Sequence, residues 1–178
     1  MAFILHSESN LPLPLSEDPS VYRTYNDVSA PPSSFPAGLL NPTLGRALAY
    51  WTSLAGGALP RRAQLSPAQM VPFLKHVILW DYLPDTDRFV CRLAGTEICE
   101  AAGRELRGRT VEEMHGDGSA AVRVNFETVI ETGHANFVHR RMSWIDRSYR
   151  SYERLLLPLA DEAGEIRHLM GVMTVDWA

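Results

Sequence analysis

The sequence predicts an α+β domain: a five-stranded antiparallel sheet, preceded by helices, with a helical insert between its second and third strands. Two observations support this prediction. Hydrophobic spacing changes from helical to strand-like near residue 76 and back to helical near residue 96, and three further strand-like segments follow. Strands joined directly by turns pair as an antiparallel meander, whereas a parallel sheet alternates strands with helices.

Composition and charge indicate one main core and exclude several functions. The 178 residues are 46% hydrophobic, and the net charge is −4 with Lys and Arg scattered along the chain, so the basic face of a nucleic-acid binder is missing. Cys91 and Cys99 form no CxxC or Cys/His pattern, which argues against a disulfide framework or a zinc site. No apolar run approaches the roughly 20 residues of a bilayer span. We therefore expect a cytoplasmic protein that binds neither nucleic acid nor membranes.

The first 40 residues are predicted to be an extended arm. Between residues 11 and 37 the chain is rich in Pro and Ser and has no hydrophobic period. Such a composition cannot build a core of its own. We place one boundary at residue 40, so that residues 41–75 form the N-terminal helices and residues 76–178 the sheet domain.

Residues 41–75 carry the spacing of two helices. The first has apolar residues at helical intervals and ends at a Gly pair: Leu44, Leu48, Trp51 and Leu54, then Gly56 and Gly57. Asn41 or Thr43 can cap its start. A short second helix is predicted in "SPAQMVPFL", with Ser66 as N-cap and Pro67 at the first helical position.

The sheet domain begins with a hairpin and continues into the helical insert. "HVILWDYL" (76–83) and "RFVCRLAG" (88–95) flank the turn "PDTD" and read as paired strands. The insert predicts two short helices and a longer one over 119–132, with Val122, Phe126, Val129 and Ile130 on one face. Three strands follow, within residues 136–144, 149–159 and 166–177.

The last strand is apolar on both faces, which predicts that both are covered. Leu169, Met173 and Val175 alternate with Met170 and Val172. An antiparallel sheet usually leaves one face to water, so covers are needed on both sides. We expect the insert to cover one face, and the 44–54 helix, from the same chain or a second copy, to cover the other.

This order of elements, with "GGALPRR", "RLAGTEI", "GRELRGR" and "LLLPL", resembles a PAS domain, and more narrowly the short stand-alone PAS proteins of alphaproteobacteria. The resemblance covers about Leu44 to Trp177. It implies a sensory module in which the inner sheet face and the insert enclose a pocket for haem, flavin or a small metabolite, while outer-face contacts reach a partner. The sequence contains no kinase, cyclase, phosphodiesterase or helix-turn-helix segment. We therefore expect a bacterial, non-enzymatic sensor that signals to a separate protein and forms a homodimer through the Leu44–Leu54 helix.

The sequence leaves the cofactor unknown. Flavin photosensors of this family carry a Cys in the insert, where this chain reads "GRTVEEMHGDG", so the resemblance argues against a cysteinyl-flavin. Haem would need an axial imidazole, and His115 is the only His in the insert. The alternative for His115 is a solvated loop residue beside glycines. His139, on a strand, is a second candidate ligand or else a cross-strand polar partner.

Three strand residues complete the candidate ligand-binding set. Arg92 lies among apolar neighbours, and Tyr152 and Arg154 share a strand face with Leu156. A buried cation needs a carboxylate or a ligand as its partner. The arginines therefore either pair with Asp81, Glu97 or Glu100, or form a pocket for an anionic ligand.

Two other functions remain open. One is a small cone-shaped enzyme of the hydratase or isomerase sort, with a His/Asp pair drawn from His139, His168, Asp81 and Asp176. The chain has no GxSxG, HExxH or phosphate loop. The other is a protein-interaction adaptor without a ligand. A His/Asp contact inside a closed cavity would favour the enzyme, a cavity without one the sensor, and a core without a cavity the adaptor.

Overall fold

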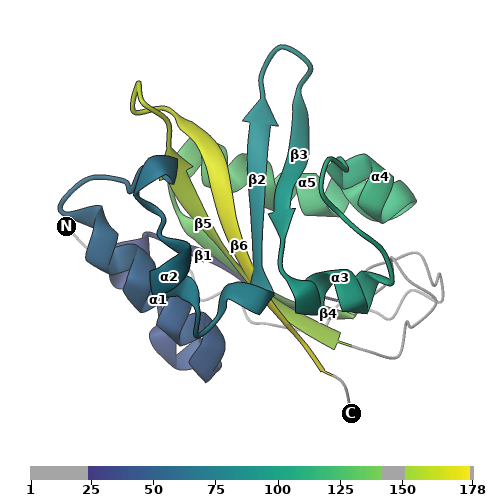
Figure 1. The fold of residues 1–178 in the computed structure, drawn as a ribbon, viewed down its shortest axis with the longest axis horizontal. Coiled ribbons are helices and arrows are strands. Elements are labelled where there is room, and N and C mark those ends of the chain that lie inside the picture. The colour runs from purple at the N-terminus through teal and green to yellow at the C-terminus, as the bar shows by residue number, and fades with distance from the viewer. Residues whose placement is uncertain (1–23, 142–150, 177–178) are drawn as a thin grey trace, which may run out of the picture.

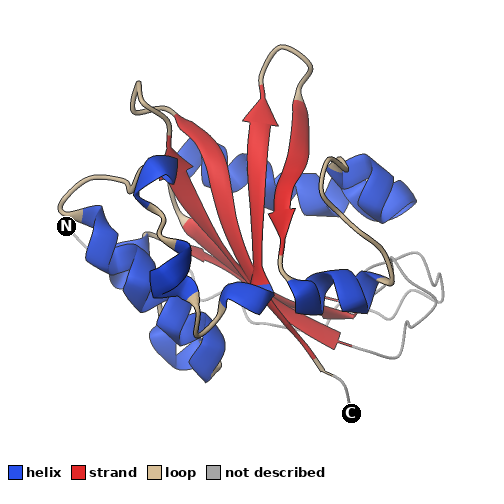
Figure 2. Ribbon diagram, viewed as in Figure 1, coloured by secondary structure: helices blue, strands red, loops and turns tan. Residues whose placement is uncertain are grey.

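A six-stranded antiparallel sheet forms the centre of the fold, and helices cover both of its faces (Figures 1 and 2). The computed structural model describes residues 24–141 and 151–176. The strand order is β1-β4-β5-β6-β2-β3. The strands are β1 (Thr24–Ala30), β2 (Val77–Leu83), β3 (Arg88–Ala94), β4 (Ala135–Arg141), β5 (Ser151–Ala160) and β6 (Ile166–Val175). The α+β prediction is confirmed. β6, the last strand in the chain, lies between β5 and β2.

The predicted number of strands was wrong by one, because β1 extends the sheet. It pairs with β4 in antiparallel register, with Asp27 opposite Val138. β1 comes from the segment predicted to be an extended arm. An edge strand needs only backbone pairing along one side, so a segment without hydrophobic alternation can still join a sheet. The predicted division at residue 40 stays a prediction.

On the outer face, helix α1 (Pro42–Ala55) packs against the sheet, followed by the short α2 (Pro67–Met70). Asn41 is the N-cap of α1, because its Oδ1 accepts hydrogen bonds from the backbone N–H groups of Thr43 (2.9 Å) and Leu44 (3.1 Å). The helix ends at Gly56 in a left-handed conformation. The outer-face cover therefore comes from the same chain, through the buried side of α1: Leu44, Ala47, Leu48 and Trp51.

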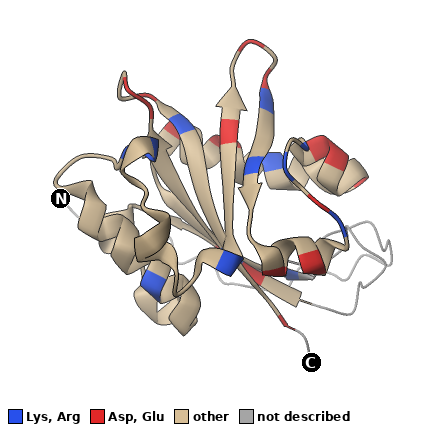
Figure 3. Cartoon of the chain, viewed as in Figure 1, with Lys and Arg blue, Asp and Glu red and all other residues tan. Residues whose placement is uncertain are grey.

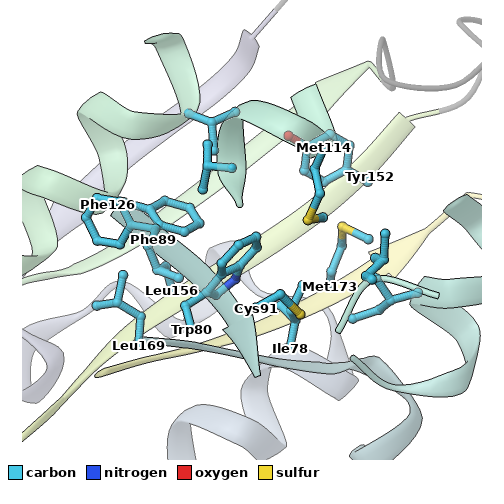
Figure 4. Packing of buried hydrophobic residues seen from close by; sticks show 14 of the residues in the cluster. Ile78, Trp80, Phe89, Cys91, Met114, Phe126, Tyr152, Leu156, Leu169 and Met173 are labelled. Atoms are coloured by element: carbon cyan, nitrogen blue, oxygen red, sulfur yellow. The ribbon is translucent and has the colours of Figure 1, made fainter. Parts of the chain in front are cut away.

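On the inner face, the insert supplies α3 (Thr96–Ala102), α4 (Val111–His115) and α5 (Ser119–Thr132). The predicted bounds of the longest insert helix are confirmed. Phe126 makes near-perpendicular ring contacts with Trp80 and Phe89, each at 5.1 Å between centroids (Figure 4). These aromatic residues anchor α5 on the sheet.

Strand β6 is buried on both sides, as its sequence predicted. Leu169, Met173 and Val175 belong to the inner core, and Met170 and Val172 belong to the outer one. In the described residues the two apolar layers form separate clusters on the two faces of the sheet. A ligand on the inner face is therefore separated from α1 by one layer of backbone.

Candidate functional site

A small cavity lies between the inner sheet face and the insert. Its volume is about 30 Å³, the space of a single water molecule. Its wall is mostly apolar, with one cation and one imidazole: Ile78, Trp80, Ile98, Met114, His115, Phe126, Tyr152, Arg154 and Met173. Met114 and Met173 lie close together beside Trp80 in Figure 4. A larger molecule would fit only if these flexible side chains moved.

The cation at the cavity, Arg154 on β5, is only 5% exposed. Its Nη2 donates to Oδ1 of Asn136 (3.2 Å) and, at a longer distance, to Oδ1 of Asn125 (3.4 Å). The guanidinium carbon lies 5.2 Å from the centre of the Phe126 ring, in cation–π geometry. The Nε of Arg154 and the Nε1 of Trp80 have no acceptor among the described residues. Two residues of the cavity wall therefore carry buried donors without partners there.

A second buried cation, Arg140 on β4, lies beside this site. Its Nη2 donates to Oδ1 of Asn125 (2.7 Å) and to Oδ2 of Asp27 (3.1 Å). Asp27 also accepts hydrogen bonds from the amides of Asn125 (3.0 Å) and Asn136 (2.8 Å). Asp27 is the only carboxylate that the described residues place against either guanidinium. Asp27 thus contacts Arg140 directly and is linked to Arg154 through Asn125 and Asn136.

The electrostatics of the cavity favour a negatively charged ligand. Burial, reinforced by repulsion from Arg154 and Arg140, lowers the pKa of His115 to about 3, so the imidazole is neutral at pH 7. Burial also lowers the pKa of Arg154 to about 10, which still leaves the guanidinium charged. The cavity therefore presents a fixed positive charge in a mostly apolar wall.

Three of the five predicted ligand-binding residues meet at this cavity: His115, Tyr152 and Arg154. His115, for which the alternative was a solvated loop residue, is the last residue of α4; it is partly exposed, and it lines the cavity. Glycines beyond the helix end gave His115 the appearance of a turn residue.

Arg92 and His139 lie elsewhere. Arg92 pairs with Asp81, one of its predicted partners, through an Nε–Oδ2 contact of 2.6 Å. His139 lines a separate polar hollow together with Glu153 and Asp176. The structure thus brings neither residue to the cavity.

The sequence analysis missed four polar residues of the site: Asp27, Asn125, Asn136 and Arg140. Asn136 and Arg140 flank Val138 at alternate positions of β4, a pattern that could have placed them on the inner face. Asn125 lies on the same side of α5 as Val122 and Val129. No local signal distinguishes Asp27, because its partners are about a hundred residues away.

A His/Asp contact exists, but it lies away from the cavity. The Nδ1 of His168 is 2.7 Å from Oδ1 of Asp81, and the two side chains are 24% and 21% exposed. Asp81 also binds Arg92. Neither His168 nor Asp81 lines the cavity. The condition that would favour an enzyme, such a pair inside a closed cavity, is therefore not met by this contact.

The described residues show no sign of a metal centre or of a membrane span. Residues 24–141 and 151–176 contain no cluster of three metal-ligating side chains. Nor does any helix there have the length and apolar character needed to cross a bilayer. Lys, Arg, Asp and Glu are spread over strands and helices on both sides of the sheet (Figure 3). Cys91 is buried, which raises its pKa to about 12, and neither cysteine is among the described cavity-lining residues.

Comparison with known proteins identifies the family. The family model PAS_5, described as "PAS domain", matches residues 40–174. The chain belongs to the PAS domain family. A search of curated proteins returned no significant match.

Solved structures similar to this PAS domain include sensory proteins. A sensory box sensor histidine kinase from Vibrio cholerae is 14% identical, with 61% of this chain and 84% of that chain covered and a TM-score of 0.43. A sensory box histidine kinase/response regulator from Burkholderia thailandensis E264 is 20% identical, with 62% and 84% covered and a TM-score of 0.38. The Aureochrome1 LOV blue-light photoreceptor is 18% identical, with 61% and 88% covered and a TM-score of 0.42. The family assignment rests on the family model.

Proposed function

We propose that this PAS domain is a non-enzymatic sensory module that binds a small molecule in the cavity beside Arg154 and signals by association with a separate protein. The observation that carries the proposal is the pair of buried donors in the cavity wall, Nε of Arg154 and Nε1 of Trp80, without acceptors among the described residues. Leaving a buried donor unsatisfied costs about 1–3 kcal/mol. A ligand with acceptor atoms would remove this cost.

The cavity can enlarge without disturbing the sheet. Met114 and Met173 both line it, and methionine side chains are unbranched and change rotamer at low cost. Met114 comes from α4 and Met173 from β6, so their movement opens space between the insert and the sheet. The volume of about 30 Å³ would then grow to accept a metabolite.

Protein association is the output that we propose, and the homodimer through α1 belongs to it. The apolar side of α1 packs on its own sheet, so a partner would meet the opposite side, which exposes Arg46, Ala49, Thr52 and Ser53. That surface carries one charged and two hydroxyl side chains, and a non-obligate interface need not be more apolar than the rest of a protein surface. A reducing compartment such as the cytoplasm suits the two free cysteines. Light scattering in solution tests the dimer, and a strictly monomeric chain would contradict it.

Native mass spectrometry, with an absorbance spectrum from 300 to 700 nm on the same sample, tests ligand binding. We expect a bound mass on the purified protein, or thermal stabilisation by a compound from a metabolite panel. Arg154→Met should abolish binding, whereas Arg92→Met, a change of an exposed arginine that does not line the cavity, should not. A protein of bare chain mass that no compound stabilises would overturn ligand binding and favour the adaptor.

A further inference from the structure

The buried arginines also indicate what kind of ligand the cavity takes and how its arrival changes the fold. Building on the proposed function, we infer that the ligand carries a carboxylate or phosphate group that competes with Asp27 for the buried arginines and so loosens strand β1 from the edge of the sheet.

The ligand class follows from the charges around the cavity. Arg140 and Arg154 are 3% and 5% exposed; among the described residues one carboxylate, Asp27, contacts Arg140, and none is within ion-pair distance of Arg154. The Nε and Nη1 of Arg140 and the Nε of Arg154 have no acceptor among those residues. A guanidinium is best satisfied by an anion that accepts two parallel hydrogen bonds. An anionic group therefore suits the site better than a neutral one.

The link to β1 follows from shared partners. Asn136 donates to Asp27 and accepts from Arg154, and Asn125 does the same. The acceptors that Arg154 has among the described residues are thus the same amides that hold Asp27. If Arg154 turns toward an anion in the cavity, these amides lose one partner and are free to reorient. The hydrogen bonds that hold the Asp27 carboxylate then weaken.

Strand register places these groups in one row across the inner face. Asp27 on β1 lies opposite Val138 on β4, Val138 lies opposite Arg154 on β5, and Arg154 lies opposite Met173 on β6. The row runs from the cavity wall to the edge of the sheet. Arg154 on β5 is therefore two strands away from Asp27, and Met173 on β6 is three strands away.

β1 is suited to leave the sheet. Among the described strands it pairs with β4 alone, and the Asp27 side chain remains 36% exposed although it accepts hydrogen bonds from three residues. A strand held by pairing along one side opens at lower free-energy cost than a strand paired along both sides. When β1 leaves, the backbone of β4 becomes available to a strand from another protein. Ligand binding would thereby expose the edge of β4 as a docking surface for that strand.

The test uses the full chain, with acetate and inorganic phosphate as probes and acetamide as the neutral control, at constant ionic strength. NMR titration gives the dissociation constants, and hydrogen–deuterium exchange follows residues 24–30. We expect acetate or phosphate, but not acetamide, to bind and to speed exchange in β1. Asp27→Asn removes the competing charge, so it should speed β1 exchange without a probe and tighten anion binding by roughly tenfold.

Asp85→Asn is the matched control, since it makes the same charge change in the exposed turn between β2 and β3. It should change neither the exchange rate of β1 nor the affinity for the anion. Asp27→Ser provides a second variant if Asp27→Asn folds poorly. Anion binding with unchanged β1 exchange and unchanged affinity in Asp27→Asn would overturn the inference while leaving the proposed function intact. Binding of acetamide alone would overturn the anionic class. A cavity that binds no probe and no metabolite would overturn the proposed function as well.

Discussion

Replacing Asn41 with Ala should destabilise the domain more than any other single change on the surface of α1. The Asn41 Oδ1 caps the helix, a role worth about 1 kcal/mol. Its Nδ2 donates to Oε2 of Glu153 (2.6 Å) and to Oγ1 of Thr174 (2.8 Å), which ties α1 to β5 and β6. At about 1 kcal/mol for each hydrogen bond, the expected loss in the free energy of unfolding is about 3 kcal/mol.

Urea unfolding followed by tryptophan fluorescence measures this loss. Asn41→Ser keeps a capping oxygen and removes the two amide donations, so its loss should be about 2 kcal/mol. Arg46→Ala, on the exposed side of the same helix, should change stability by less than about 0.5 kcal/mol. A loss below about 1 kcal/mol in Asn41→Ala, with an unchanged denaturant slope, would refute the reasoning. Equal losses in the Ala and Ser variants would show that the cap contributes nothing.

Three further predictions concern single sites. A Cβ at Gly95 would overlap the backbone oxygen of Lys75, so Gly95→Ala should lower the free energy of unfolding by about 3 kcal/mol in chemical denaturation. Gly45→Ala, within α1 and with open space around it, should be neutral or slightly stabilising. Equal effects of the two substitutions would contradict this packing. The pKa of His115 is lowered to about 3, so the unfolded chain binds a proton that the folded chain does not, and stability should fall as pH drops from about 6.5 toward 3. His115→Gln should flatten that dependence in unfolding curves recorded across this pH range, and an unchanged slope would contradict the lowered pKa of His115. Burial raises the pKa of Cys91 to about 12, so at pH 8 its thiol should react with Ellman's reagent only on unfolding, and rapid native labelling of Cys91 would show that the inner core is open.

The elements whose signal is local could be predicted from the sequence. The spacing of Val122, Phe126 and Val129 located α5 because a helix repeats its buried side every three to four residues. The Asn41 cap and the β2–β3 hairpin were also found, since their determinants lie within a few residues. The predicted turn at "IDRS" lies outside the described residues.

The features that depend on distant partners could not be predicted in full. Arg154 was predicted either to pair with a carboxylate or to line an anion pocket, but its partners Asn125 and Asn136, which lie 29 and 18 residues away, were not found. Asp27 and Arg140 are separated by 113 residues, and no local pattern connects them. For the same reason β1 was missed, because its place in the sheet depends on backbone pairing with β4.

The central position of β6 constrains how this domain can be made. β6 joins the β2–β3 hairpin on one side to β5, β4 and β1 on the other, yet it follows all of them in the chain. During synthesis, the β2–β3 hairpin and the β5-β4-β1 strands therefore cannot pair through β6 until residues 166–175 have left the ribosome exit tunnel. Until then their apolar surfaces stay exposed. Chaperone protection during this interval would matter more for this domain than for one whose sheet is assembled in chain order. A slow codon run after β5 would lengthen the interval.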